Sequence, residues 1–167
     1  KPKDIVGIDI GKASVKLVHI KHSGAYSELA GYAIKPLKIS KPSASRDDRA
    51  GSMEITAQAV KEALAGMSIN QKTSECYVCL DISSVITKRL SLVTMPEDEL
   101  RQAIKLAMKG TVPFDIEKAS TDLKVIGQYT DAEGINKLDV MVAAADKVTV
   151  EWFLDLGKTA GFTLSGI

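Results

Sequence analysis

Four residues between positions 9 and 16 have the types and spacing of a site for a metal-bound phosphate chain. The segment reads IVGIDIGKASVKLVHI, with an acid before a glycine turn and a lysine after it. Asp9 can hold Mg²⁺ through water, because magnesium gives up its hydration shell reluctantly. Gly11 lets the backbone approach a ligand closely, so that N–H groups of the turn can point at phosphate oxygens. Ser14 can donate a hydrogen bond to phosphate, and Lys16, on the same strand face, can supply positive charge.

This pattern is not specific by itself, because aspartate and glycine are common at hairpin turns. The alternative interpretation is a tight turn that binds nothing and leaves Lys16 exposed to solvent. The choice depends on the elements that would position these side chains.

The first part of the chain indicates three strands, a helix and two more strands. Ser23 and Gly24 are typical of a hairpin turn between the second strand and the third. From Ser52 the apolar residues recur at helical spacing, which predicts a helix to about residue 67. The strands are predicted at residues 5–10, 14–21, 26–35, 75–82 and 85–93. This order predicts an antiparallel trio followed by a helical crossover to a further strand.

A second unit is predicted to begin with a helix after residue 93. Thr94 and Glu97 have the spacing of a capping box, and Pro96 suits the first turn of a helix. The helix should end near Gly110, because Pro113 cannot continue it.

A hairpin and a last helix complete this unit. The hairpin is predicted from strands at 121–129 and 137–145 around a turn at 131–136. Asp146 is expected to cap a helix that ends at Gly161. The residues after that glycine begin a strand that the chain does not finish, so we expect a larger protein to continue beyond residue 167.

Residues 35–51, KPLKISKPSASRDDRAG, are rich in proline, serine and charge. This composition predicts a solvated loop. The alternative is a mobile segment that contacts a partner.

The cysteines and histidines offer two further candidate sites, and both are weak. Cys76 and Cys79 form a CxxC motif, but they fall in a predicted strand, where positions three apart point to opposite faces. No second cysteine pair or nearby histidine completes a tetrahedral zinc site. His19 and His22 have no acidic partner nearby in sequence, so we expect them to lie at the surface or at a sheet edge.

Composition excludes some classes of function. The 167 residues carry a formal net charge of +1, which gives no electrostatic footprint for nucleic acid. The apolar runs are all too short to span a bilayer. There is no signal-peptide pattern at the start, and a cytosolic setting is the default expectation.

Three segments together resemble the PilM family of actin-like type IV pilus assembly proteins. They read VGIDIGKASVKLVHI, MPEDELRQAIKLAMKGTVPFDIEKASTDLKVIG and DVMVAAADKVTVEWFLDLGKTAGF. The resemblance runs over nearly the whole chain. The cell-division protein FtsA is similar in architecture, but its inserted subdomain has no segment comparable to VPFDIE, so the PilM family is the better match.

The resemblance implies a mixed α/β (α+β) fold. It would be the N-terminal half of an actin-like (ribonuclease H-like) architecture, with a small α+β subdomain inserted into it. The first-half core would span residues 1–90 and the inserted subdomain residues 91–162. Residues 163–167 would begin a strand that returns to the core.

In actin-like ATPases and sugar kinases the first hairpin of such a core carries the first phosphate loop. The resemblance therefore implies that Asp9, Gly11, Lys12, Ser14 and Lys16 serve nucleotide, with Mg²⁺ on Asp9 through water. Relatives often have a small residue where this chain has Lys12, which would either crowd the loop or add a phosphate contact.

ATP and Mg²⁺ are the cofactors that the resemblance implies for an intact protein. The second phosphate loop and the adenosine pocket should follow residue 167. We therefore expect the present chain to have little affinity for ATP and to catalyse no hydrolysis, since much of the binding surface would be missing.

The implied function is that of a cytoplasmic scaffold at the inner-membrane face, within the type IV pilus assembly platform. The expected partner is the short cytoplasmic N-terminal tail of PilN, held in a groove between the core and the inserted subdomain. Other inner-membrane pilus proteins and the assembly motors are also expected partners, whereas nucleic acid is not, and any membrane association would run through partners. The candidate groove residues are Leu90, Leu92, Val112, Pro113 and Phe114, and the alternative for each of them is simple core packing.

Two other functions remain open. A sugar or acid kinase of the same superfamily would need a catalytic aspartate, but Asp81 and Asp139 have no obvious basic or polar companions. The chain could also be a pure peptide-binding module whose phosphate loop is vestigial.

Overall fold

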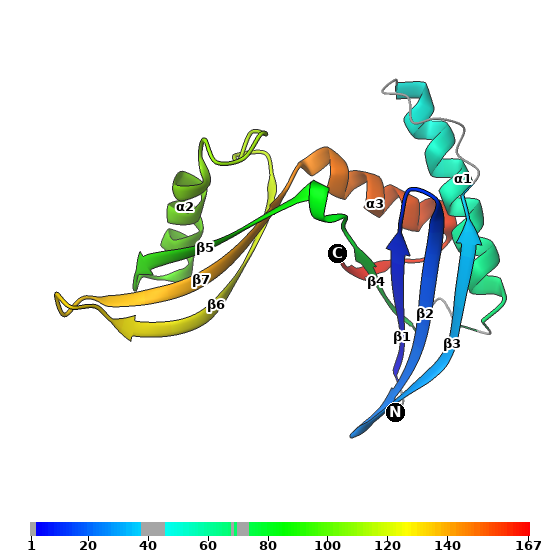
Figure 1. Ribbon diagram of the computed structural model, residues 1–167, viewed down its shortest axis with the longest axis horizontal. Helices are drawn as coiled ribbons and strands as arrows, with labels where there is room; N and C mark the ends of the chain where they lie inside the picture. Colours follow the sequence, from blue (N-terminus) through cyan, green and yellow to red (C-terminus); the bar gives the residue numbers. More distant parts are fainter. Residues whose placement is uncertain (1–2, 38–45, 68, 70–73) are drawn as a thin grey trace. The chain divides into compact units, whose positions relative to one another are not determined.

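The computed structural model describes residues 3–37, 46–67, 69 and 74–167 (Figure 1). The chain forms two compact units. The first unit comprises Lys1–Asp81 and Glu151–Ile167, and the second comprises Ile82–Val150. The first unit is thus interrupted in sequence by the second. No helix in the described part of the chain is long and apolar enough to cross a membrane.

A five-stranded sheet forms the frame of the first unit. Its strands are β1 (Lys3–Ile10), β2 (Ser14–Ser23), β3 (Tyr26–Pro36), β4 (Glu75–Cys79) and β8 (Leu164–Gly166). They lie in the order β3-β2-β1-β4-β8. The first three strands form an antiparallel meander, whereas β4 runs parallel to β1 and β8 runs parallel to β4.

Two helices, α1 (Arg46–Ala65) and α3 (Lys147–Ala160), share a core with one face of this sheet. Alternation along β2 buries Val15 and Leu17 on that face. Val60 and Leu64 of α1 and Leu156 of α3 are almost fully buried in the same core. Each such aliphatic side chain contributes about 1.5–3 kcal/mol by leaving water, so the helices hold the meander in place.

The opposite face of this sheet, called the open face below, carries no helix among the described residues. Its register places Tyr32, Val18, Gly7 and Tyr77 in one row across four neighbouring strands. The side chains of Tyr32, Val18 and Tyr77 are all exposed. Asp9 and Lys16 lie on the same face, one row nearer the β1–β2 turn.

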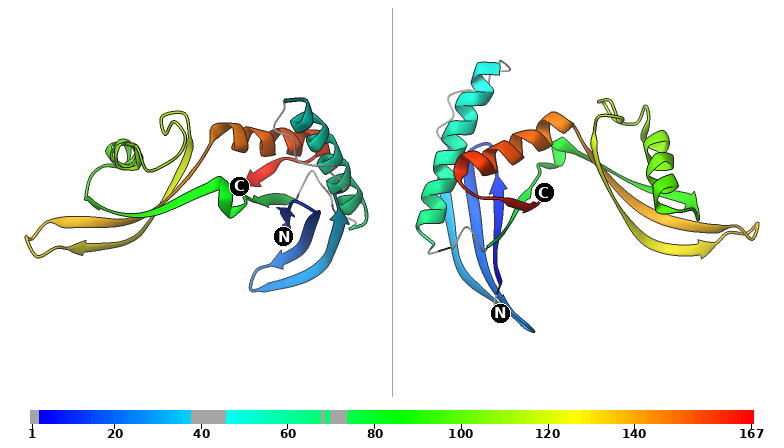
Figure 2. Two further views of the ribbon diagram at one scale, coloured as in Figure 1. Left: turned by 45° about the horizontal axis from the view of Figure 1, so that its top comes forward. Right: turned by 180° about the vertical axis from the view of Figure 1, so that it is seen from behind.

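The second unit is a three-stranded antiparallel sheet with one helix on it. Its elements are the 3₁₀ turn η1 (Ile82–Ser84), β5 (Val85–Val93), α2 (Glu97–Met108), β6 (Ser120–Thr130) and β7 (Asn136–Ala145). The strands lie in the order β5-β7-β6, and α2 lies on one side of them in Figures 1 and 2. Leu100, Ile104 and Met108 of α2 pack on Val140 and Val142 of β7 in a separate core.

Most predicted elements are confirmed, together with the mixed α/β class. The hairpin turn is held by Asp131, whose Oδ1 accepts the backbone N–H groups of Glu133 at 3.0 Å and Ile135 at 2.9 Å. Asp146 caps α3, because its Oδ1 accepts the Val148 N–H at 3.3 Å. The helix ends as predicted at Gly161, whose φ of 86° is left-handed.

The loop predicted at residues 35–51 is wrong at both ends. β3 continues to Pro36, and α1 already begins at Arg46. The apolar helical spacing starts only after Ser52, whereas the preceding turns of α1 read RDDRAG and gave no apolar signal. Residues 38–45 of the predicted loop lie outside the described part.

The capping box predicted at Thr94 and Glu97 is also wrong. The residue before the first turn of α2 is Pro96, and no side chain caps the helix there. Thr94 instead donates its backbone N–H to Asn136 O at 2.9 Å, at the end of the β5–β7 pairing. Three acids in the first turn, Glu97, Asp98 and Glu99, still favour the helix through its dipole.

The bounds of the two units differ from the expected 1–90, 91–162 and 163–167. β5 belongs with the second unit, because it pairs with β7 along its whole length. Most of α3 belongs with the first unit, because Phe153, Leu156 and Ala160 are buried in the first core.

Candidate functional site

The β1–β2 hairpin makes Asp9 and Lys16 direct cross-strand neighbours. The Lys16 Nζ lies 2.8 Å from Asp9 Oδ2, and each side chain is 52% exposed. The alternation that buries Ile8, Val15 and Leu17 in the core sends both charged groups to the open face. The two side chains expected to contact Mg²⁺ and phosphate therefore neutralise each other in this structure.

Gly11 serves the turn through a close backbone approach. Its N–H donates to Ser14 O at 2.9 Å, and a Cβ at Gly11 would lie 3.3 Å from that same oxygen. Its φ is not among the left-handed values found at Gly24 and Gly134. Gly11 is therefore needed here for its small size and not for its backbone conformation, because a side chain would press on the carbonyl that closes the hairpin.

The remaining turn residues are held or displayed differently. Lys12 is exposed, and Ser14 is half-buried at the first position of β2. Ala13 O accepts the Leu37 N–H at 2.8 Å, which ties the turn to the residue after β3. All five predicted turn residues thus lie together in one hairpin.

A phosphate could displace Asp9 from Lys16 at low cost. An exposed ion pair of this kind is worth at most about 1 kcal/mol, and the released carboxylate could then hold a hydrated Mg²⁺. Within residues 3–37, 46–67, 69 and 74–167 no group of three or more histidine, cysteine or acidic side chains is placed to hold a metal ion. A metal at this turn would therefore depend on one carboxylate, water and the phosphate itself.

The two cysteines lie on opposite faces of β4, which confirms their interpretation as ordinary strand residues. Cys76 is buried in the first core, and this burial raises the pKa of its thiol. Cys79 is exposed on the open face as the parallel neighbour of Asp9. Both are free thiols.

The expectation that His19 lies at the surface without an acidic partner is wrong. Its side chain is almost fully buried, and its Nε2 lies 2.8 Å from Asp4 Oδ1. The two residues are 15 apart in sequence but lie on the same inner face of adjacent strands, since Val6 is the direct neighbour of His19. His22 is half-buried, and its Nδ1 contacts Ser27 Oγ at 3.0 Å.

The predicted groove residues all belong to the second unit. Leu90 and Leu92 lie on β5 opposite Val140 and Leu138 of β7. Along with Val112 and Phe114 they are half-buried and pack against the second core, whereas Pro113 is exposed. The four apolar side chains thus combine a packing role with free surface.

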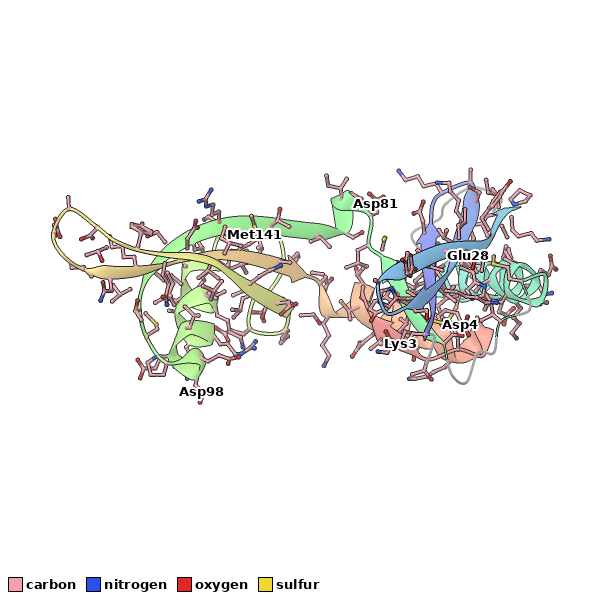
Figure 3. All side chains as sticks on the ribbon, turned by 90° about the horizontal axis from the view of Figure 1, so that it is seen from below. Lys3, Asp4, Glu28, Asp81, Asp98 and Met141 are labelled. Atoms are coloured by element: carbon pink, nitrogen blue, oxygen red, sulfur yellow. The ribbon has the colours of Figure 1, made fainter. Side chains whose placement is uncertain are left out.

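A cleft in the second unit was not predicted. It has a volume of about 620 Å³ and lies between α2 and the edge strand β6. Its lining residues are Asp98, Arg101, Gln102, Ile104, Lys105, Thr121, Asp122 and Leu123, and the first of these lies at the start of α2 in Figure 3. The helical spacing of Asp98, Arg101 and Lys105 placed them on one face of α2, but only the fold shows which strand they face.

One acid considered for a kinase is engaged elsewhere. Asp139 accepts hydrogen bonds from Arg89 Nε, at 2.7 Å, and from Arg89 Nη2. The expectation that this acid has no basic companion is therefore wrong, because Arg89 reaches it from the neighbouring strand. The guanidinium holds the pKa of Asp139 below its ordinary value.

Comparison with known proteins places these elements in a family. The family model described as type IV pilus assembly protein PilM matches residues 7–165. Among solved structures, the PilM–PilN type IV pilus biogenesis complex matches with a TM-score of 0.76 and 24% identity, covering 96% of this chain and 46% of that one.

A second solved structure is similar at lower identity. It is the cytoplasmic domain of EpsL, an inner-membrane component of the type II secretion system of Vibrio cholerae, with a TM-score of 0.63 and 12% identity. The match covers 98% of this chain and 56% of that one. The present chain thus spans about half the length of each of these structures, and both have the fold expected from the sequence.

Proposed function

The chain belongs to the PilM family of type IV pilus assembly proteins, and from this premise we propose that it is part of a scaffold that docks the cytoplasmic tail of a PilN-type inner-membrane protein. The scaffold acts at the cytoplasmic face of the inner membrane. It reaches the membrane, other pilus proteins and the assembly motors through its partners.

The observation that carries this proposal is the match to a PilM–PilN complex over 96% of the chain. The relative is in a complex with PilN, and this supports the proposal that a PilN-type tail docks on a chain of similar fold. The match to an inner-membrane component of another secretion system agrees with a platform role.

Leu90, Leu92, Val112 and Phe114, with Pro113 beside them, are the residues that we propose for the peptide. Half-burial leaves part of each apolar side chain free to contact an extended segment, while the rest is anchored in the second core. An anchored side chain loses little rotamer freedom on binding, which favours affinity.

We propose nucleotide as a ligand only of a longer protein that would also carry the second phosphate loop and the adenosine pocket. The turn at Asp9, Gly11, Lys12, Ser14 and Lys16 would contact the phosphate chain, and Asp9 would hold Mg²⁺ through water. Lys12 is exposed and free of the Asp9 contact, so it would add a phosphate contact rather than crowd the loop. The present chain would act as a docking module without catalysis.

Peptide binding to the 167-residue chain tests the docking proposal. A fluorescent peptide with the sequence of the PilN N-terminal tail should bind saturably, and Leu92→Ser with Phe114→Ser should weaken binding at least roughly tenfold, as loss of two apolar anchors implies. Because both residues pack on the core, circular dichroism must show that the variant is folded. Leu106→Ser, at a leucine that is 74% exposed on α2, is the matched control and should bind normally. Equal binding by the double variant would refute the groove assignment.

A kinase is the competing function. Its candidate acid Asp139 is tied to Arg89, so this carboxylate is not free to act as a catalytic base. Phosphoryl transfer from ATP to a panel of sugars and carboxylic acids by the longer protein would overturn the scaffold proposal.

A further inference from the structure

β3 is an outer strand of the five-stranded sheet, and much of its apolar surface is exposed. It is 11 residues long, and among the residues that the structure describes β2 is its one strand partner. Tyr26, Leu29, Tyr32 and Ile34 are 82%, 60%, 73% and 62% exposed. A long edge strand with exposed apolar side chains is a template for pairing with another strand.

One hydrogen bond shows which residues of β3 direct their backbone N–H and C=O groups toward the open edge. Leu37 N–H donates to Ala13 O, so the residue after β3 directs its polar groups toward β2. Backbone groups alternate in direction along a strand, and Tyr32 and Ile34 therefore direct their N–H and C=O groups away from β2. Pro36, which has no N–H, occupies the next such position, where a proline is tolerated at an edge.

A bulge sorts the side chains of β3 onto the two faces. Gly31 is the neighbour of His19, whereas Leu29 is already the neighbour of Ile20, so Ala30 is the extra residue. As a result Leu29, Tyr32 and Ile34 all lie on the open face. Glu28 and Lys35 lie on the opposite face, next to Lys21 and Val15.

We propose that β3 pairs with β3 of a second copy of this chain, antiparallel, about a two-fold axis at Tyr32. Such an axis, perpendicular to the sheet, keeps each face on its own side, so Tyr32 faces Tyr32 of the second copy. Ile34 then faces Leu29 of the second copy across the bulge. One step further, Lys35 faces Glu28 of the second copy. The Ile34–Leu29 and Lys35–Glu28 contacts each occur twice, whereas the Tyr32 pair lies on the axis and occurs once.

The charges of this arrangement are self-complementary. Glu28, labelled in Figure 3, is exposed, and Lys35 is half-buried. Within the part of the chain that the structure describes, no ion pair is formed by either side chain. Directly opposed charges across antiparallel strands attract, and like charges in the same positions repel.

A second copy is favoured over an unrelated peptide by this match. A peptide of another protein would need its own acid, base and apolar residues at these spacings. The antiparallel β3 of a second copy already has them at the required positions. The proposal goes beyond docking of a PilN tail, because it concerns the first unit only.

Reciprocal charge reversal tests the register. Sedimentation velocity of the 167-residue chain should show a reversible dimer, and Glu28→Lys or Lys35→Glu alone should weaken it by roughly tenfold through two like-charge contacts. An equimolar mixture of the two single variants should recover the dimer, because each contact is then again between opposite charges. Ile34→Pro removes an edge N–H without removing a bond to β2 and should leave a monomer, whereas Ile34→Val should not.

Matched controls are Glu133→Lys and Lys124→Glu, which make the same charge changes at exposed positions of the second unit and should leave dimerisation unchanged. Thermal unfolding must show that every variant is folded. A wild-type chain that stays monomeric up to about 1 mM, the weak limit of a specific contact, would overturn the proposal. So would a dimer insensitive to both charge reversals, or a monomer whose Tyr32 and Ile34 amides are protected from hydrogen exchange only by a PilN-type peptide.

Discussion

Lys16 Nζ lies 2.8 Å from Asp9 Oδ2 across the β1–β2 hairpin. The contact joins the two charges that a phosphate site would use, and it leaves exposed Lys12 as the lysine of the turn that does not contact Asp9. Any anion that binds here must compete with Asp9 for Lys16. The affinity of the turn for phosphate therefore depends on how much that competition costs.

We predict that the 167-residue chain binds Mg-ATP weakly and does not hydrolyse it. Lys16 is neutralised by Asp9, so Lys12 alone attracts a phosphate chain. The exposed Asp9–Lys16 pair changes the binding free energy by at most about 1 kcal/mol, whether it forms or breaks. Isothermal calorimetry should show no saturation up to about 1 mM nucleotide. Micromolar binding of Mg-ATP would contradict this prediction.

Removing the competing carboxylate should change anion binding in a defined direction. Asp9→Asn frees Lys16, so tripolyphosphate without Mg²⁺ should bind up to several-fold more tightly, within the range of an exposed ion pair. Asp9→Asn combined with Lys16→Met should lose that gain. Chemical shift changes of the Gly11 and Ser14 amides during titration provide the measurement.

The turn should be more sensitive to a methyl group at Gly11 than at Gly7. In Gly11→Ala the new Cβ would lie 3.3 Å from Ser14 O. Because this is a backbone atom that cannot easily move aside, the substitution should lower the free energy of unfolding by about 1 kcal/mol. In Gly7→Ala the new Cβ would meet no atom within 4 Å. Because glycine is unfavourable inside a strand, this substitution should be neutral or stabilising. Trp152, the single tryptophan, lies in the first unit and reports its unfolding by fluorescence.

Acid should destabilise the second unit through two aspartates. Arg89 lowers the pKa of Asp139, and Lys137, with the N–H groups of Ile135 and Glu133, lowers that of Asp131. A lowered folded-state pKa contributes stability above the ordinary value of 3.8 that is lost as pH falls through the folded value. The urea concentration at half-unfolding, followed by circular dichroism, should therefore decrease when the pH is lowered below about 4, where ordinary carboxyl groups become protonated. In Asp131→Asn and Asp139→Asn this acid dependence should be shallower, and an unchanged slope in both would contradict the prediction.

Removing only one partner of the His19–Asp4 contact should destabilise the protein more than replacing both partners. Asp4→Ala leaves a buried imidazole nitrogen without its partner and should cost about 1–3 kcal/mol of unfolding free energy. Asp4→Ala with His19→Leu replaces both polar groups and should be less destabilising than Asp4→Ala alone. Denaturant unfolding followed at Trp152 measures both. A double variant less stable to denaturant than Asp4→Ala would show that the imidazole packs in a way that leucine cannot replace.

Much of the fold could be predicted because its signals are local. The turn at Asp131 and the cap at Asp146 each depend on a side chain bonding backbone groups within four residues, which a sequence shows directly. The alternation along β2 likewise showed which face Lys16 would take. The mixed α/β class followed from the order of these elements.

The missed features depend on neighbours that the sequence does not specify. His19 looked unpaired because Asp4 lies on another strand, and Asp139 looked unpaired for the same reason with Arg89. Thr94 had the right spacing for a cap, but the end of β5 had already used its N–H. The Asp9–Lys16 contact was within reach of prediction, since a hairpin closed at Gly11 makes them opposite residues.

The interruption of the first unit by residues 82–150 has a consequence for how the chain folds. β8 joins β4 late in synthesis, and the Cys76 N–H is bonded to Ser165 Oγ over a separation of 89 residues. Closing a flexible loop of that length carries an entropic cost that grows with the logarithm of its length. If the second unit folds first, it replaces most of that loop by a rigid insert and lowers the cost. The nascent chain should thus form its second unit before its first, although the first begins earlier at the ribosome.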